Sequence, residues 1–299
     1  MPPVVEASVL IATRDRPRAL ERCVQAILDG DVWPRQIIVV DQGAEPALSG
    51  LTPNPGNPER VVLRDDGIGL SRARNLALEA ARCPVAAVID DDCVPTPRWL
   101  ASIIEALDRE PVADCICGPV LPLPPEGMKR YPTSTRASLE AADYQGPAVP
   151  WQVGTGGNFA IRTRLARRLG GYDPRLGAGS PSGASEDIDL IYRVLRAGAR
   201  IRYAPAALVH HERADAGRRR ATRSSYGRGI GAFIGTHLRA GDLRAAALLP
   251  RWLLQRAGLL ARAAAHADRE AMAEELIVMR ATCGGLVHGL RRRPGRESS

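Results

Sequence analysis

Short runs of apolar residues alternate with helical patterns along the first two thirds of the chain. The runs are rich in Val, Ile and Ala and are bounded by polar or turn residues, which is typical of strands that are buried on both faces. The segments between them carry apolar residues at helical spacing. The predicted strands are 8–12, 36–41, 60–63, 85–89, 114–120 and 158–162, and the predicted helices are 18–28, 71–81, 97–107, 164–169 and 187–197.

This alternation predicts an α/β fold with a mostly parallel central sheet that helices cover on both faces. Two stretches interrupt the pattern. Residues 51–59 are rich in Pro, Gly and Asn and are predicted to form a loop, while the proline-rich residues 122–150 are expected to be irregular, as a surface wrap or a lid. Residues 201–203 and 207–209 are expected to be extended.

The pattern changes near residue 213. Beyond that point, leucines and Trp252 recur at helical spacing among arginines, and a second helical pattern runs from 268 to 287. We therefore expect one α/β domain over residues 1–212, followed by a basic amphipathic helical region over residues 213–299.

Charge separates the same two regions. The 299 residues carry a formal net charge of +8, but residues 1–212 hold 24 Lys and Arg against 26 Asp and Glu, whereas residues 213–299 hold 17 against 7. Arginine clusters occur at 218–220 and 291–293. Such a region suits an anionic membrane surface or an acidic partner. The leucines and Trp252 at helical spacing also suit packing on the α/β domain or a homodimer interface. A solvated, arginine-rich helix surface would account for the charge as well.

Several classes of protein are disfavoured by missing motifs. No G-x-G-x-x-G follows the first predicted strand and no G-x-x-x-x-G-K-[ST] occurs, which argues against a dinucleotide-dependent oxidoreductase and a P-loop NTPase. Aromatic residues make up only 4% of the chain and do not alternate with basic ones, so no nucleic-acid partner is expected. The chain shows neither a signal-peptide pattern nor a long uncharged apolar window, and its six cysteines form no C-x-x-C pair; we expect a cytoplasmic protein with reduced thiols.

The strongest local signal is VAAVIDDDCVP at residues 85–95. A buried strand there ends in Asp90, Asp91 and Asp92, and ligands of open α/β sheets bind beyond the carboxyl ends of the strands. Three adjacent carboxylates repel one another unless a cation is present, and hard divalent cations take oxygen ligands. In an extended segment, Asp90 and Asp92 would face the same side and Asp91 the other. An acidic loop or a helix cap would give the same pattern.

A second signal is SEDIDLIYRVLRAG at residues 185–198. Glu186 and Asp187 precede a helix whose apolar residues recur at helical spacing, so the core anchors that helix. Acidic residues at a helix start are also favoured by the helix dipole alone. The Gly- and Ser-rich run 177–185 places the pair on a loop that leads into the helix, which suits a substrate-binding base.

These motifs, together with others in the same order, resemble family 2 of the inverting glycosyltransferases, whose catalytic domain has the Rossmann-like GT-A fold. The resemblance covers roughly residues 8–212. The segments that carry it are SVLIATRDRP (8–17), IIVVDQG (37–43), GLSRARNLAL (69–78), VIDDDC (88–93), GTGGNFAIRT (154–163), GGYDPRL (170–176), SEDIDL (185–190) and YAPAALVHH (203–211).

The resemblance implies roles for the matching residues. Asp187 would be the general base, and Glu186 would orient the acceptor or the base. A divalent cation, Mn²⁺ or Mg²⁺, would be held by Asp92, Asp90 and His211, while the neighbouring His210 is as readily a surface histidine. The residues implied in binding the nucleotide-sugar are Thr13, Arg14, Asp15, Asp41, Arg74, Asp90, Asp91, Gly157 and Asn158.

The implied activity is transfer of a sugar, with inversion, from a UDP-, dTDP- or GDP-linked donor to a hydroxyl or amine of an acceptor that the sequence does not identify. A positioned carboxylate would take the acceptor proton, and a cation would stabilise the leaving diphosphate. Two alternatives stay open: a nucleotidyltransferase, although ATRDRP stands where a Gly-rich loop with Arg and Lys is expected, and a degenerate transferase domain that serves as a binding or scaffold protein. Residues 213–299 would place the chain peripherally on the inner membrane face or form a homodimer.

Overall fold

The computed structural model describes residues 1–46, 58–109, 111–124, 131–132 and 134–291. Most of the predicted loop 51–59, together with Arg292 and Arg293, lies outside these ranges. The chain forms two compact units. The α/β unit comprises Met1–Pro174 and Asp187–Asp215, and the helical unit comprises Arg175–Glu186 and the residues from Ala216 onward.

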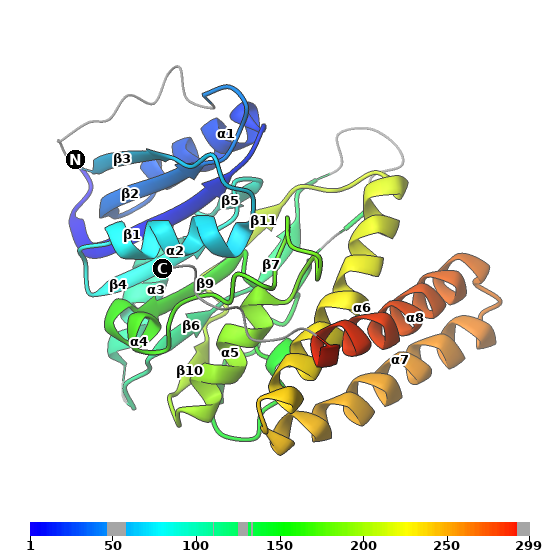
Figure 1. The fold of residues 1–299 in the computed structure, drawn as a ribbon. Helices are drawn as coiled ribbons and strands as arrows, with labels where there is room; N and C mark the ends of the chain where they lie inside the picture. Colours follow the sequence, from blue (N-terminus) through cyan, green and yellow to red (C-terminus); the bar gives the residue numbers. More distant parts are fainter. Residues whose placement is uncertain (47–57, 110, 125–130, 133, 292–299) are drawn as a thin grey trace. The chain divides into compact units, whose positions relative to one another are not determined.

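The α/β unit is built on an eight-stranded sheet in the order β3-β2-β1-β4-β9-β6-β10-β8 (Figure 1). The first four strands in this order are parallel, and β10 is parallel to β6. The expected mostly parallel sheet is therefore confirmed, although β9 runs antiparallel to both neighbours and β8 antiparallel to β10. The strands are β1 (Val4–Thr13), β2 (Trp33–Asp41), β3 (Glu59–Arg64), β4 (Val85–Ile89), β6 (Cys115–Cys117), β8 (Ala142–Tyr144), β9 (Asn158–Arg162) and β10 (Ile201–Tyr203).

Helices cover both faces of this sheet, as expected (Figure 1). Alternate residues of β1 enter two separate cores: Val9 and Ile11 pack with α1 and α3, whereas Leu10 packs with α2, α4 and α5. This alternation follows from the two-residue period of a strand. The helices are α1 (Pro17–Leu28), α2 (Leu70–Ala80), α3 (Trp99–Asp108), α4 (Thr163–Arg168) and α5 (Glu186–Arg196).

A smaller sheet of three strands has the order β5-β11-β7, with β5 at Cys93–Pro95, β7 at Val120–Pro122 and β11 at Val209–His211. The single strand predicted over 114–120 is wrong, because β6 and β7 belong to different sheets and the chain changes sheet at Gly118. A Cβ atom at Gly118 would overlap the carbonyl oxygen of Ala207. This close approach of two backbones explains why the apolar run is interrupted by Gly and Pro.

Two further details differ from the sequence prediction. The extended segment expected at 207–209 begins two residues later, at β11. Within its described residues, the expected irregular stretch 122–150 contains the short strand β8 and the beginning of a 3₁₀ helix, η1 (Pro150–Gln152).

The described residues of the helical unit confirm the expected C-terminal helical extension. Its elements are α6 (Ala216–Arg239), a 3₁₀ helix η2 (Leu243–Ala247), α7 (Leu248–Ala265) and α8 (Arg269–Arg291). Helices α6 and α8 lie side by side at glycines: a Cβ atom at Gly231 would overlap the carbonyl oxygen of Thr282, and one at Gly285 would overlap that of Arg228. The two helix backbones therefore touch directly.

One apolar and one basic residue of α7, Trp252 and Arg256, pack inside the helical unit. Trp252 is buried and its Nε1 donates to Thr282 Oγ1 over 3.0 Å. The Arg256 guanidinium lies 4.5 Å from the Trp252 ring centre and 3.3 Å from Glu275 Oε2. Leu254 and Leu259 are exposed. Within the described ranges, the structure contains no helix with the length and hydropathy that crossing a membrane requires.

Residues 175–186 also belong to the helical unit. A Cβ atom at Gly229 of α6 would come within 2.7 Å of the Ala184 carbonyl and within 2.6 Å of Ser185 Oγ. Ser185 has a positive φ of 75°, a conformation that few non-glycine residues adopt. The loop that leads into Asp187 is thus packed tightly against α6.

Candidate active site

Asp90, Asp91 and Asp92 form a turn between β4 and β5. The N–H of Cys93 donates to the Asp90 carbonyl over 3.0 Å and closes this turn. The extended geometry expected for the three aspartates is therefore wrong, because β4 ends at Ile89 and the chain bends there into the smaller sheet. The turn still brings the carboxylates of Asp90 and Asp92 together.

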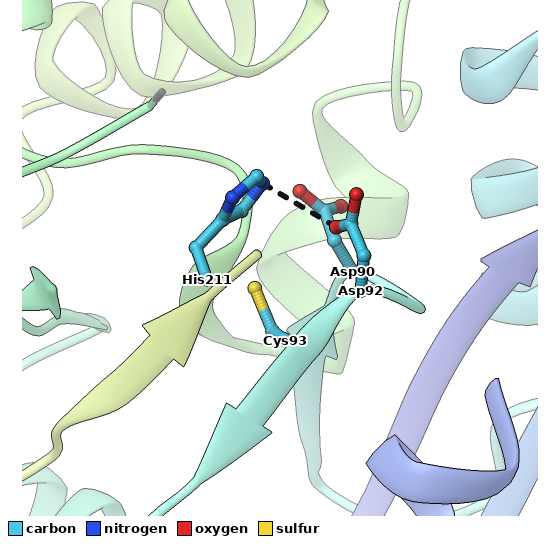
Figure 2. A group of neighbouring side chains, drawn as sticks. All are labelled: Asp90, Asp92, Cys93 and His211. Carbon is cyan, nitrogen blue, oxygen red and sulfur yellow. Dashed lines mark ion pairs between the residues drawn. The ribbon is translucent and has the colours of Figure 1, made fainter. Parts of the chain in front are cut away.

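A cluster of four side chains lies at this turn (Figure 2). One ligand atom from each of Asp90, Asp92, Cys93 and His211 can be chosen so that all four atoms lie within 4.8 Å of one another. Three of the four are the predicted metal ligands, and sequence reasoning missed Cys93. Burial raises the pKa of the Cys93 thiol well above its ordinary value. Because hard cations prefer oxygen to sulfur, Asp90, Asp92 and His211 are the better donors for Mn²⁺ or Mg²⁺.

His211 is oriented as a metal ligand would be. Its Nδ1 lies 2.6 Å from the Glu212 carbonyl oxygen, and its Nε2 lies 3.3 Å from Asp92 Oδ1. A carbonyl oxygen only accepts hydrogen bonds, so Nδ1 is the nitrogen that donates to Glu212, and Nε2 faces the Asp92 carboxylate. Metal-binding histidines usually donate their second N–H in this way. The side chains present therefore fit a divalent cation.

Two arginines offset the repulsion among the three aspartates. Arg74 Nη2 lies 2.6 Å from Asp90 Oδ1. Arg16 Nη1 lies 3.0 Å from Asp91 Oδ1 and 2.8 Å from Asp92 Oδ2. Arg16 was not among the predicted site residues, although it follows the predicted residues Thr13 to Asp15 directly, and an arginine in the loop after the first strand was the available signal.

Asp91 connects the turn to β1. Its Oδ2 accepts a hydrogen bond of 2.7 Å from Thr13 Oγ1, so these two predicted nucleotide-binding residues are bonded to each other. Burial raises the pKa of Asp91 to about 6, although Arg16 and Thr13 act in the opposite direction. Asp91 therefore holds the ends of β1 and β4 together.

Asp187 lies at the start of α5 and is held at both carboxylate oxygens. Oδ2 accepts from the Gly156 N–H over 2.7 Å, and Oδ1 accepts from the Ile188 N–H over 2.8 Å. Desolvation raises the pKa of Asp187, and the positive charge of Arg74 opposes that shift. A carboxylate with a raised pKa accepts a proton more readily, which suits a general base. Its neighbour Glu186 is buried and belongs to the helical unit.

The remaining predicted nucleotide-binding residues divide into two groups. Asp41 is buried, with Oδ1 accepting from the Gly43 N–H over 2.8 Å and Oδ2 lying 2.6 Å from Arg64 Nη1. Asp15 is exposed, has a φ of 56°, and accepts from the Ala44 N–H over 2.9 Å. The loops that follow β1 and β2 are thus joined, and the exposed Arg14 lies on the first of them.

Gly157 and Asn158 lie at the start of β9. A Cβ atom at Gly157 would come within 2.8 Å of Asp90 Oδ2, so glycine leaves room for that carboxylate. Asn158 accepts from Trp99 Nε1 over 2.9 Å and donates to the carbonyls of Pro119 and Ala207 over 2.9 and 2.6 Å. Its amide links the sheets to α3, while its predicted nucleotide contact stays a prediction.

Sequence comparisons identify relatives with transferase activity. A model of the family described as "Glycosyl transferase family 2" matches residues 8–170. The chain is 28% identical over 214 residues to the Pre-mycofactocin glycosyltransferase of Mycobacterium tuberculosis, a match that covers 69% of this chain but only 43% of that protein. It is 24% identical over 220 residues to the Glucosyl-dolichyl phosphate glucuronosyltransferase of Haloferax volcanii, covering 70% of this chain and 69% of the relative. The chain thus spans less than half of the mycobacterial relative.

Solved structures share the fold. The mannosyltransferase PcManGT from Pyrobaculum calidifontis, in complex with GDP-Man and Mn²⁺, matches with a TM-score of 0.60 at 18% identity and covers 94% of this chain and 87% of its own. S. aureus TarS 1-349 in complex with UDP-GlcNAc matches with a TM-score of 0.63 at 14% identity and covers 94% and 82%. At these identities the likeness concerns the fold alone, and it confirms the expected GT-A fold.

Proposed function

The chain belongs to glycosyl transferase family 2, and we propose that it moves a sugar, with inversion, from a nucleoside-diphosphate donor to an acceptor hydroxyl or amine. The observation that carries this proposal is the convergence of Asp90, Asp92 and His211 at the ends of two sheets. Asp187 supports it, because a second, separate carboxylate is needed to take the acceptor proton.

A divalent cation would be held by Asp90, Asp92 and His211, with Mn²⁺ or Mg²⁺ as candidates. When bound, it would stabilise the negative charge of the leaving nucleoside diphosphate. PcManGT was solved with Mn²⁺, which is in keeping with this assignment. Arg74, which lies against Asp90, would orient the carboxylate and add positive charge beside the donor.

Asp187 would act as the general base and deprotonate the acceptor as it attacks the anomeric carbon. Attack from the face opposite the leaving group inverts that carbon in one step, and it requires a single base. The hydrogen bonds from Gly156 and Ile188 would fix the carboxylate for this transfer. Glu186 would orient the acceptor.

The donor would bind at the carboxyl ends of β1, β2 and β4. Asp41, with its neighbours Thr13, Arg14 and Asp15, is proposed for the nucleoside, and Gly157 and Asn158 for the sugar side. PcManGT was solved with GDP-Man and TarS with UDP-GlcNAc, so UDP-, dTDP- and GDP-sugars are the candidate donors for this chain. A cytoplasmic location would supply them.

The helical unit is proposed to contact an anionic membrane peripherally. Helix α7 contains no Asp or Glu, and its exposed surface combines Arg251 and Arg262 with Leu254 and Leu259. Such a surface suits lipid phosphates and the headgroup boundary. The Haloferax relative is named for a dolichyl phosphate substrate, which makes a lipid-linked acceptor a reasonable candidate. A homodimer through the same surface is the alternative.

Thermal unfolding in the presence of UDP, dTDP or GDP, with and without Mn²⁺ or Mg²⁺, tests the proposed donor. A ligand that binds the folded state raises the unfolding temperature. We expect one diphosphate to do so only with the cation, and the matching nucleotide-sugar then to be slowly hydrolysed. A scaffold protein would not hydrolyse the sugar donor, and a nucleotidyltransferase would instead release pyrophosphate from a nucleoside triphosphate and a sugar phosphate.

A further inference from the structure

Arg16 lies beside the aspartate turn, and the proposed function assigns it no role. Its Nη1 atom contacts one oxygen of Asp91 and one oxygen of Asp92. At its other oxygen, Asp91 accepts a hydrogen bond from Thr13, and Asp92 lies 3.3 Å from His211 Nε2. The guanidinium therefore provides positive charge at the very carboxylate that is proposed to hold the cation.

The two sides of this contact differ in how firmly they are held. The side chains of Asp91 and Asp92 are only 6% and 3% exposed, whereas that of Arg16 is 41% exposed. Arg16 stands at the N-terminal boundary of α1, between the exposed residues Asp15 and Pro17. Asp91 keeps its bond to Thr13 if the arginine leaves. The guanidinium is therefore the more solvent-accessible side of this contact.

A divalent cation at Asp90, Asp92 and His211 would place two positive charges beside Arg16. Repulsion between like charges weakens the contact between Arg16 and Asp92 at that point. The donor brings a diphosphate to the same cation, and a guanidinium binds phosphate oxygens through two parallel N–H groups. The anion that arrives with the donor is thus a better partner for Arg16 than the carboxylate it leaves.

The geometry points to Arg16 as a further donor-binding residue: it neutralises Asp92 before the cation binds, and it contacts the diphosphate once the cation is in place. This inference rests on the proposed function, because it needs both a cation at Asp92 and a diphosphate donor. It makes Arg16 a competitor of the free cation and a partner of the diphosphate, two effects of opposite sign in one side chain.

The test measures the two affinities separately in the full chain. Binding of Mn²⁺ alone is followed by the electron paramagnetic resonance signal of the free ion, and binding of UDP or GDP at saturating Mn²⁺ by calorimetry. Arg16→Gln should bind Mn²⁺ severalfold more tightly, because a competing charge is gone. The same variant should bind the diphosphate about tenfold more weakly, which is the effect of one lost charge-assisted hydrogen bond.

Three comparisons sharpen the result. Arg18→Gln removes the same charge from an exposed position on α1 and should leave both affinities unchanged. Arg16→Lys keeps the charge and should restore Mn²⁺ affinity to the wild-type value, with a partial recovery for the diphosphate. The corresponding nucleoside monophosphate lacks the second phosphate and should lose less affinity in Arg16→Gln than the diphosphate does.

If Arg16 served only to hold the aspartate turn, Arg16→Gln would weaken Mn²⁺ and diphosphate together, and that result would overturn the inference. Equal behaviour of Arg16→Gln and Arg18→Gln would overturn it too. A wild-type chain that binds neither Mn²⁺ nor any nucleoside diphosphate would instead contradict the proposed function, and the inference would fail with it.

Discussion

The backbone N–H of Gly156 donates a 2.7 Å hydrogen bond to Asp187 Oδ2. These residues are 31 positions apart, and the bond fixes the carboxylate at the start of α5 to the segment that enters β9. A Cβ atom at Gly156 would come within 2.9 Å of both the Asp187 Cβ and Arg74 Nη1. Asp187 is therefore held by backbone groups, and it lies where the Arg74 charge reaches it.

Replacing Asp187 by Asn should remove the base while keeping its size. We expect transfer to fall by roughly 10²–10⁴-fold, the usual contribution of general-base catalysis. The affinity for nucleoside diphosphate with Mn²⁺ should stay within about twofold of the wild-type value, because Asp187 is not a proposed donor ligand. Turnover and calorimetric binding measured on the same preparation check both statements, and near-normal turnover would mean that another group is the base.

The difference in stability between the wild-type chain and Asp187→Asn should depend on pH. The pKa of Asp187 is raised in the folded chain, so the folded state keeps its proton at pH values where the unfolded chain has lost it. Wild-type stability at this site is highest below the unfolded pKa of about 3.9 and declines as pH rises through the folded pKa. Asp187→Asn avoids that decline. Its unfolding temperature relative to wild type should therefore be higher at pH 8 than at pH 4, as followed by circular dichroism.

The acid side of the pH–rate profile should report the same group. Transfer needs Asp187 as a carboxylate, so kcat/KM at saturating Mn²⁺ should rise with pH through a pKa above the ordinary aspartate value. Arg74 lowers the pKa of Asp187, and Arg74→Gln should therefore move the acid limb to higher pH in addition to weakening donor binding. An acid limb that stays in place or moves to lower pH would show that Asp187 does not set it.

Asp92→Asn should abolish the proposed cation site. The amide is a weaker ligand, and it leaves His211 without the carboxylate that lies 3.3 Å from its Nε2. We expect the Mn²⁺-dependent rise in unfolding temperature with nucleoside diphosphate to disappear and transfer to be lost. His211→Asn should weaken Mn²⁺ less, since two carboxylates remain. Full activity of Asp92→Asn in the presence of EDTA would rule out a cation at this position.

Helix packing in the helical unit gives a prediction that is independent of catalysis. Gly231→Ala would push a Cβ atom into the Thr282 carbonyl of α8, whereas Gly258 of α7 has nothing within 4 Å of the added atom. Gly231→Ala should destabilise the chain by about 1–3 kcal/mol through overpacking, and Gly258→Ala should stabilise it by about 0.5–1 kcal/mol through helix propensity. Thermal unfolding of both variants measures the difference, and equal effects would contradict the close helix contact.

The proposed membrane contact predicts binding to anionic vesicles at low salt and loss of binding at high salt. At low salt, replacing Arg251 and Arg262 by Gln should reduce co-sedimentation, and Leu254→Ala should reduce it as well, because both the charges and the apolar contact contribute. The paired residue Arg256 is left unchanged, because it is held by Glu275 inside the unit. If the chain does not bind anionic vesicles at low salt but sediments as a dimer, the result favours the homodimer over the membrane contact.

Much of the fold could be predicted because the buried strands leave a strong pattern. Runs such as QIIVVD and VAAVID admit few polar residues when both faces are covered, so the pattern predicts β4 with its observed bounds and all of β2 except its first three residues. Strand direction leaves no such trace: the run in β9 has the same pattern whether it is parallel or antiparallel to β4. The division at Gly118 was missed because the carbonyl of Ala207 that demands glycine there comes from 89 positions further along the chain.

The site was predictable where one segment contributes several groups, as in the three aspartates. It was less predictable where the partner comes from a remote segment. Cys93 joins the cluster because β5 pairs with β11, which places it opposite His211. Arg16 and Asp92 are 76 positions apart in the sequence. The polar segment TRDRP is typical of an exposed loop, so the sequence does not indicate which residue this arginine contacts. The spacing of apolar residues predicts helices and strands, but it does not predict which remote side chains come into contact.

The close packing of Ala184 and Ser185 against Gly229 limits which segments of this chain can be exchanged with those of a relative. A chimera that exchanged only residues 213–299 would join a foreign α6 to the native 175–186 loop, and any side chain at position 229 would collide with that loop. Because the next residues are Glu186 and Asp187, the collision would reach the proposed base along the backbone. Functional chimeras should therefore inherit both stretches from the same parent, as one discontinuous module.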